Sequence, residues 1–144
     1  MTIRPTALTL LLLAITAVRA DGEGPPLVEL RIGEQTVEAE LAITAEARRH
    51  GLMERQRMAE NRGMLLVYPR PQTLRLWMRN TPLPLSAAFI DEGGVILNIA
   101  QMAPERLDIY LSNGEAKYAL EMNRGWFAER GIGPGARVEG LDGL

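Results

Sequence analysis

The feature that most constrains the fold is a two-residue alternation of apolar and charged side chains. It runs through residues 27–32 and again through residues 37–41, with Gly-Glu-Gln at 33–35 between the two runs. Successive side chains of a strand point to opposite faces, so each run has one apolar face and one charged face. The sequence therefore predicts a β-hairpin that turns at Gly33.

Short apolar runs bounded by glycine or proline predict further strands along the rest of the chain. They lie at residues 64–68, 74–78, 85–90, 95–99, 118–122 and 136–138. Pro69 and Pro71 are expected to break the first of these runs from the second. The Asp-Glu-Gly-Gly segment at 91–94 predicts a tight turn that joins two antiparallel strands.

Helices are expected to be short. Thr44 can cap a helix over residues 45–50 that ends at Gly51, and residues 124–130 can form one or two helical turns. The predicted fold class is mostly β with a minor α component, a compact antiparallel sheet with one or two short helices. The pattern leaves both a closed barrel and an open roll as alternatives.

The first twenty residues predict a secretory signal peptide. Arg4 precedes an apolar run over residues 7–15, and Val-Arg-Ala at 18–20 offers a cleavage site. The apolar run is shorter than the roughly 20 residues of a spanning helix, so no stable membrane span is expected after cleavage. We therefore expect a flexible lead at 21–26, a single globular β-rich domain at 27–144, and a periplasmic or secreted location.

Composition excludes several kinds of chemistry. The chain has no cysteine and one histidine, His50, which excludes disulfides and thiolate sites and argues against a catalytic triad or a histidine-rich zinc site. No glycine-rich phosphate loop is present, and the methionines are expected to pack in the core. No metal or cofactor is predicted.

Charge gives little support to a nucleic-acid partner. Removal of residues 1–20 takes two of the 16 basic residues and none of the 18 acidic ones, which leaves an acidic domain. One basic run, Arg48-Arg49-His50, is followed by Arg55, Arg57 and Arg62. Nearby glutamates balance these charges, so we expect a solvated helix face.

Five blocks follow one another in order along the chain, with glycines at 131 and 135 after them. They are GLMER at 51–55, GMLLV at 63–67, WMRNTPLPL at 77–85, FID at 89–91 and YALE at 118–121. This order closely resembles the prokaryotic domain of unknown function 192 family, also called uncharacterised protein family 0127, over about residues 27–138. The resemblance implies a small barrel-like β domain and no agreed activity. Two positions depart from the family pattern, because Ser86 and Ala136 stand where an aspartate is usual.

The block at 77–84 contains the main candidates for ligand binding. Alternation places Trp77 and Arg79 on one face of a strand, and Asn80 and Thr81 at its end. A ring, a cation and two short polar side chains can hold a small polar or anionic ligand. The structural alternative is that Asn80 and Thr81 tie the turn while Trp77 packs in the core.

Glu121 and Arg55 complete the candidate set. Glu121 lies in an apolar strand, where it can pair with Arg79 or Arg55, act as a base, or simply face outward. Three functions follow: a small-ligand or accessory binding module, a hydrolase or lyase using Glu121 with Arg79, and an envelope protein-interaction domain. A cavity with a shifted carboxylate favours the enzyme, and a pocket lined by Trp and amides without such a carboxylate favours the binding module. A flat apolar patch favours the interaction domain.

Overall fold

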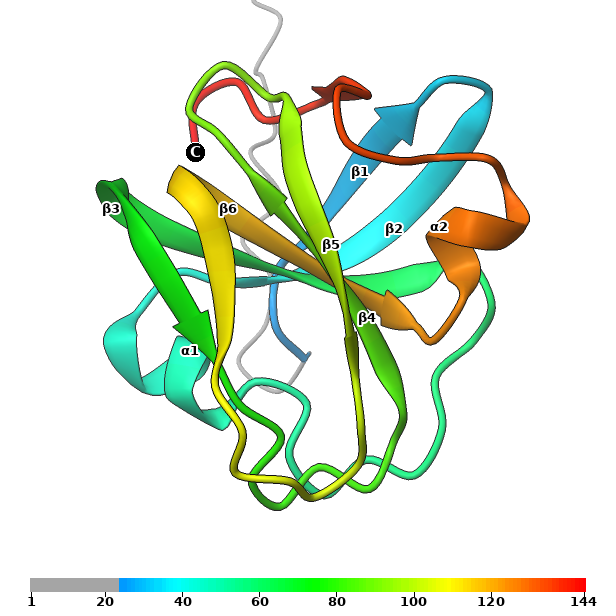
Figure 1. Cartoon of the computed structure of the whole chain (residues 1–144). Helices are drawn as coiled ribbons and strands as arrows, with labels where there is room; N and C mark the ends of the chain where they lie inside the picture. Colours follow the sequence, from blue (N-terminus) through cyan, green and yellow to red (C-terminus); the bar gives the residue numbers. More distant parts are fainter. Residues whose placement is uncertain (1–23) are drawn as a thin grey trace, which may run out of the picture.

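The computed structural model describes residues 24–144, so the predicted signal peptide at 1–20 lies outside the described residues. Seven strands and two short helices make up this part of the chain (Figure 1). They are β1 (Leu27–Ile32), β2 (Gln35–Ala42), α1 (Ala45–His50), β3 (Arg62–Leu76), β4 (Leu85–Ile90), β5 (Ile96–Met102), β6 (Tyr110–Asn123), α2 (Trp126–Glu129) and β7 (Val138–Glu139). Neither helix is long and apolar enough to cross a membrane.

All seven strands form one sheet in the order β5-β4-β6-β3-β2-β1-β7. The sheet curls into a half-barrel, which confirms the predicted mostly β, rolled fold. An antiparallel bridge between Val95 and Arg137 joins the two ends of the sheet at one point. One pair, β2 and β3, is parallel. A parallel pair needs a crossover between its strands, and here residues 43–61 form that crossover and contain α1.

The predicted local elements are largely confirmed. β1 and β2 form the hairpin, with Gly33 at φ 59° in its turn. Thr44 caps α1, since its hydroxyl oxygen accepts from the Ala47 N–H at 3.1 Å, and Gly51 ends the helix. In the 91–94 turn, the Asp91 carboxylate accepts from the Val95 N–H at 2.9 Å.

The predicted break at the two prolines is wrong. β3 continues through Pro69 and Pro71 as one strand, but its pairing with β6 skips from Val67 to Gln72. Proline cannot donate to a ladder, yet its φ is compatible with an extended chain, so the strand bulges there and does not end.

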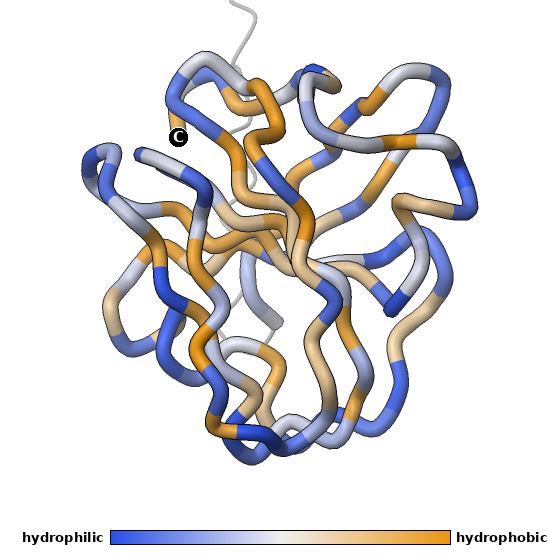
Figure 2. Tube along the Cα trace, in the orientation of Figure 1, coloured by the Kyte–Doolittle hydropathy of each residue, from blue (hydrophilic) through white to orange (hydrophobic). Residues whose placement is uncertain are grey.

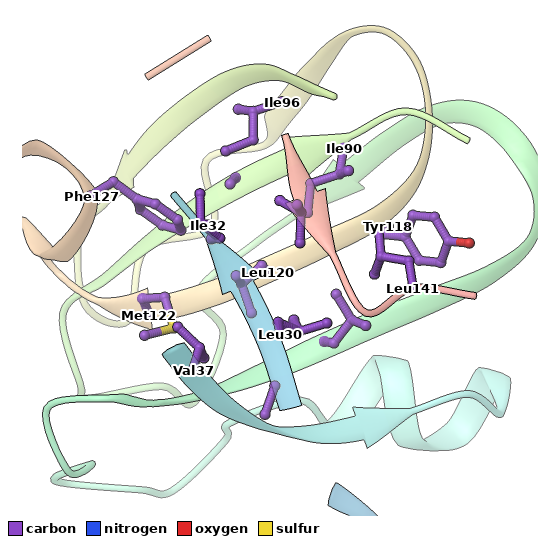
Figure 3. Packing of buried hydrophobic residues seen from close by; sticks show 14 of the residues in the cluster. Leu30, Ile32, Val37, Ile90, Ile96, Tyr118, Leu120, Met122, Phe127 and Leu141 are labelled. Carbon is purple, nitrogen blue, oxygen red and sulfur yellow. The ribbon is translucent and has the colours of Figure 1, made fainter. Parts of the chain in front are cut away.

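Two apolar cores lie on the two faces of the central strands. Residues 63–67 of β3, all of β4 and residues 118–122 of β6 are buried throughout. The apolar colours of Figure 2 concentrate in the crossing central strands, and the polar colours in the outer loops. One core, shown in Figure 3, includes Leu30, Leu120 and Phe127. The other includes Leu66, Leu85 and Phe89.

The second core lies on the side of the sheet that carries α1 and the loop before β4. Its buried residues include Leu52 from the crossover and Met78 and Leu83 from the segment between β3 and β4. Four methionines are buried, as expected for packing: Met64, Met78, Met102 and Met122. This second side of the sheet holds the candidate site.

Candidate functional site

A cavity of about 260 Å³ opens between α1, the end of β3 and the C-terminal end of β6. Glu121 contributes from β6, Tyr68 and Arg75 from β3, and Arg48 and Arg49 from α1. A second, more open cavity of about 620 Å³ adjoins it. The two cavities share five lining residues: Arg49, His50, Met53, Trp77 and Arg79.

Glu121 is the buried carboxyl group of the cavity. It pairs in the sheet with Met64 of β3 and Ala87 of β4, so its side chain emerges among the residues of the second core. Only 6% of the residue is exposed. This excludes the alternative of an outward-facing strand residue, and it means that Glu121 is held in apolar surroundings.

Burial raises the pKa of Glu121 from 4.5 to about 7. The charged form loses hydration here without gaining a counter-charge, and desolvation of this kind favours the neutral carboxyl. The Oε2 atom is fully buried and has no hydrogen-bond partner among the residues that the structure describes. Within residues 24–144, Glu121 forms no ion pair, which excludes the alternative that it pairs with Arg55 or Arg79.

Gly51 allows the crossover to pass over the Glu121 carboxyl. Its φ of 49° and ψ of −130° form a conformation that side chains rarely adopt. A methyl group added at Gly51 would lie 3.9 Å from Oε2 of Glu121. The glycine of the GLMER block is therefore required by the backbone directly above the buried acid.

Four arginines line the same cavity. They are Arg48, Arg49, Arg75 and Arg79. In the part of the chain that the structure describes, none of the four has an acidic partner within salt-bridge distance. Arginines that line a cavity without an acidic partner favour anions, because each offers several charged donors.

The four arginines differ in how firmly the surrounding protein holds their side chains. Arg48 is fixed, since its Nη1 donates to the Val67 carbonyl at 2.9 Å and to the Ile43 carbonyl. Its guanidinium also lies 4.7 Å from the ring centre of Tyr68. Burial is the main cause that raises the pKa of the Tyr68 hydroxyl. Arg48 therefore helps to build the wall, while Arg49, Arg75 and Arg79 are exposed and available to a ligand.

Residues of the Trp77–Thr81 segment line the two cavities. Trp77 is 38% exposed, which excludes the core alternative, and the guanidinium carbon of Arg79 lies 5.5 Å from its ring centre. Thr81 is buried, and its hydroxyl donates to the Arg79 carbonyl at 3.0 Å. Asn80 has a left-handed φ of 52° and lines the outer cavity.

Arg55 lies outside both cavities. Its guanidinium donates twice to the Glu40 carboxylate, at 2.7 and 2.6 Å, and this bond raises the pKa of Arg55. The pair ties the crossover to β2. Arg55 thus supports the segment that covers the site, and the structure does not bring it to Glu121.

The basic run on α1 was underestimated by the sequence argument. Arg48, Arg49 and His50 line the cavity, although they were expected to form only a solvated helix face. Tyr68 and Arg75 of β3 were missed as well. The sequence offered one signal, since the basic run directly precedes the GLMER block. Glu46 is the one acid that stands a helical turn before Arg49 and His50, where it can pair with a basic side chain of the same helix.

Ser86 stands away from the cavity. It is fully buried, donates to Oε1 of Gln101 at 2.7 Å and accepts from the Gly125 N–H at 2.9 Å. Its neighbour Ala87 is the residue paired with Glu121, so Ser86 points to the opposite face of the sheet. The loss of an acid at this position leaves the cavity intact.

Comparison with known proteins decides the family. The model of the DUF192 family, described as "Uncharacterized ACR", matches residues 28–140. The chain belongs to this family. No curated protein matches the DUF192 chain.

The solved structures that resemble this DUF192 chain include two crystal structures. One is described as a candidate transcription regulator from Sinorhizobium meliloti 1021. It is 33% identical with a TM-score of 0.79, and the match covers 83% of this chain and 98% of that one. The other is a protein of unknown function from Novosphingobium aromaticivorans DSM 12444. It is 30% identical with a TM-score of 0.76, covering 83% and 89% of the two chains.

Proposed function

We propose that this DUF192 domain binds a small anionic ligand in the cavity between α1 and β6. The observation that carries the proposal is that Arg49, Arg75 and Arg79, which lack acidic partners within residues 24–144, line one cavity. An anion bound there would gain charge-assisted hydrogen bonds while the cavity walls exclude part of the water. The export signal predicted at residues 1–20 supports a periplasmic or secreted location for this binding.

The binding proposal is tested by ligand-induced stabilisation of the purified protein. Carboxylates, phosphates and sulfates are screened for a rise in melting temperature, since a ligand of the folded state adds about 2.7 kcal/mol at a hundredfold excess over its Kd. The double variant Arg49→Ala with Arg79→Ala should lose the response. Arg124→Ala is the matched control, because Arg124 is exposed and lines neither cavity.

Two results would refute anion binding at this site. One is the absence of stabilisation by any anion of the panel. The other is equal stabilisation of the wild type and the double variant, which would place the bound anion elsewhere on the surface.

Acid–base catalysis is the second candidate, and the pKa of Glu121 favours it. A carboxyl with a pKa of about 7 can accept and return a proton at neutral pH, with Arg79 able to stabilise an anion nearby. Such a hydrolase or lyase must first bind its substrate, so binding is common to both functions. Once a turnover assay is found, Glu121→Gln should abolish activity while ligand binding persists.

An interaction role in the envelope receives weaker support. Leu107, Ile109 and Leu111 are exposed on the segment that enters β6, and such side chains favour protein contacts. The interaction hypothesis, however, expected an apolar patch in place of a cavity, and a cavity is present. A nucleic-acid role is not proposed, because the arginines line a concavity and α1 is only six residues long.

A further inference from the structure

The floor and the rim of the cavity differ in chemistry, and this difference restricts the ligand. In the described part of the chain, the rim holds Arg49, Arg75 and Arg79, which have no acidic partner. The floor holds the carboxyl of Glu121, whose Oε2 lacks a hydrogen-bond partner there. A ligand that is only an anion would satisfy the rim and leave the floor unsatisfied. Leaving a buried polar atom unpaired is costly, so the complete ligand should also present a group to Glu121.

A hydroxyl group fits Glu121 better than an ammonium group. An ammonium group offers donors only, so it cannot accept the proton of a neutral Glu121 carboxyl. A hydroxyl donates to the ionised carboxylate and accepts from the neutral carboxyl, and Glu121 titrates near neutral pH. The hydroxyl is therefore compatible with both states of the buried acid.

The mouth of the cavity adds an aromatic surface. The half-exposed Trp77 ring lines both the inner and the outer cavity. Large aromatic side chains supply apolar contact area for a ring, and a cavity of about 260 Å³ has room for one six-membered ring with its substituents.

Resting on the proposed anion binding, we infer that the ligand is a hydroxylated carboxylic acid of the sugar-acid class. Its carboxylate would bind Arg49, Arg75 and Arg79 at the rim, and a hydroxyl would reach Glu121 on the floor. Trp77 would contact the ring. The inference thus assigns two separate groups of one small molecule to two separate parts of the cavity.

Three matched probes test this assignment by calorimetric titration of the purified protein. Glucuronate has a carboxylate and hydroxyls, cyclohexanecarboxylate has the carboxylate on a ring without hydroxyls, and glucose has hydroxyls without the carboxylate. We expect glucuronate to bind at least about tenfold more tightly than either of the others, the effect of one hydrogen bond to a charged group.

Glu121→Leu is the decisive variant. It should reduce the affinity for glucuronate to that for cyclohexanecarboxylate and leave the latter unchanged. An apolar residue suits this buried position, and Glu121→Gln provides a second variant that keeps the polar shape. Glu115→Leu, on the same strand but exposed, should leave all three affinities unchanged.

The possible outcomes distinguish a failure of the sugar-acid assignment from a failure of the proposed anion binding. Equal binding of glucuronate and cyclohexanecarboxylate, or unchanged discrimination in Glu121→Leu, would overturn the inference while anion binding stands. Binding of phosphate or sulfate with no binding of either carboxylate would do the same. Glucose binding as tightly as glucuronate would contradict the need for the anionic group. Failure of every anion would remove the proposed function and the inference together.

Discussion

Glu121 is the residue at which burial and charge conflict most strongly. Its raised pKa makes the stability of the fold depend on pH. Other charged or titratable residues line the cavity that holds Glu121. β3 contributes Tyr68 and Arg75, and the loop after β3 contributes Arg79. The helix α1 contributes Arg48, Arg49 and His50. Desolvation is nonetheless the cause that raises the pKa of Glu121, so burial of its carboxyl determines how stability changes with pH.

Replacement of Glu121 by Gln should stabilise the protein at high pH. Below pH 4.5 the carboxyl is neutral in both the folded and unfolded states, and burial then carries no charge penalty. As the pH rises from 4.5 to 7 the unfolded state loses its proton first, so the wild type loses stability relative to Glu121→Gln, in total about 3 kcal/mol.

Urea unfolding at pH 4.5 and pH 8 measures this difference. Glu115→Gln, an exposed glutamate on the same strand, serves as the control and should show no comparable change with pH. A stability difference between Glu121→Gln and the wild type that stays constant over this range would show that Glu121 titrates normally.

Gly51 gives a second prediction at the residue scale. Gly51→Ala should destabilise the fold by about 1–2 kcal/mol, because a side chain is strained at the φ of 49°. Gly133→Ala is the control, since Gly133 has open space and no left-handed φ. Thermal unfolding of the two variants distinguishes strain at Gly51 from a general effect of added methyl groups.

At the scale of elements, the helix α1 contributes to the site, and the Thr44 side chain caps its N-terminus. Thr44→Ala removes the hydroxyl that accepts from Ala47 and should cost about 1 kcal/mol. Because α1 carries Arg48, Arg49 and His50, the same change should weaken anion binding. Thr44→Ser keeps the cap and should restore both stability and affinity. Unaltered melting and binding in Thr44→Ala would show that packing alone holds α1.

Local patterns predict most elements of this chain, because each is encoded by neighbouring residues. The hairpin follows from alternation around Gly33, and α1 from Thr44 and Gly51. β3 differs, since Pro69 and Pro71 disfavour a strand locally while pairing with β6 on both sides keeps it extended. The strand boundaries there depend on a distant partner, which no window of sequence contains.

The candidate site could be predicted only in part for the same reason. Trp77 and Arg79 were found because they are adjacent in sequence, and Glu121 because a charge stands out in an apolar strand. The convergence of α1 with β6 was not accessible, since it depends on how the crossover folds over the sheet. The pairing of Arg55 with Glu40 likewise joins segments whose proximity only the structure reveals.

At the scale of the whole molecule, both cores share the strands β3, β4 and β6, so they should unfold together. Trp126 is buried in the first core, where it lies edge to face with Phe127 and its indole N–H donates to Asn61. Trp77 reports on the opposite side. With only two tryptophans in the chain, Trp77→Phe and Trp126→Phe leave one reporter for each side.

The fluorescence midpoints of these two variants in urea should each coincide with the midpoint from circular dichroism of the same variant. Stability itself should differ between them, because replacing the buried Trp126 removes packing and Trp77 is exposed at the cavity mouth. A fluorescence transition that precedes the loss of strand signal in one variant would mean that its side of the sheet opens separately.

The parallel pairing of β2 with β3 has a consequence for how the specificity of this fold can change. The crossover at residues 43–61 contributes one wall of the cavity as a single contiguous insert between two strands whose register is fixed by the sheet. Exchanging that insert between homologues would exchange Arg48, Arg49 and His50 together, while Glu121 stays in place. Under the proposed anion binding, transplanting residues 43–61 should therefore change which ligand binds while the strands of the sheet stay the same.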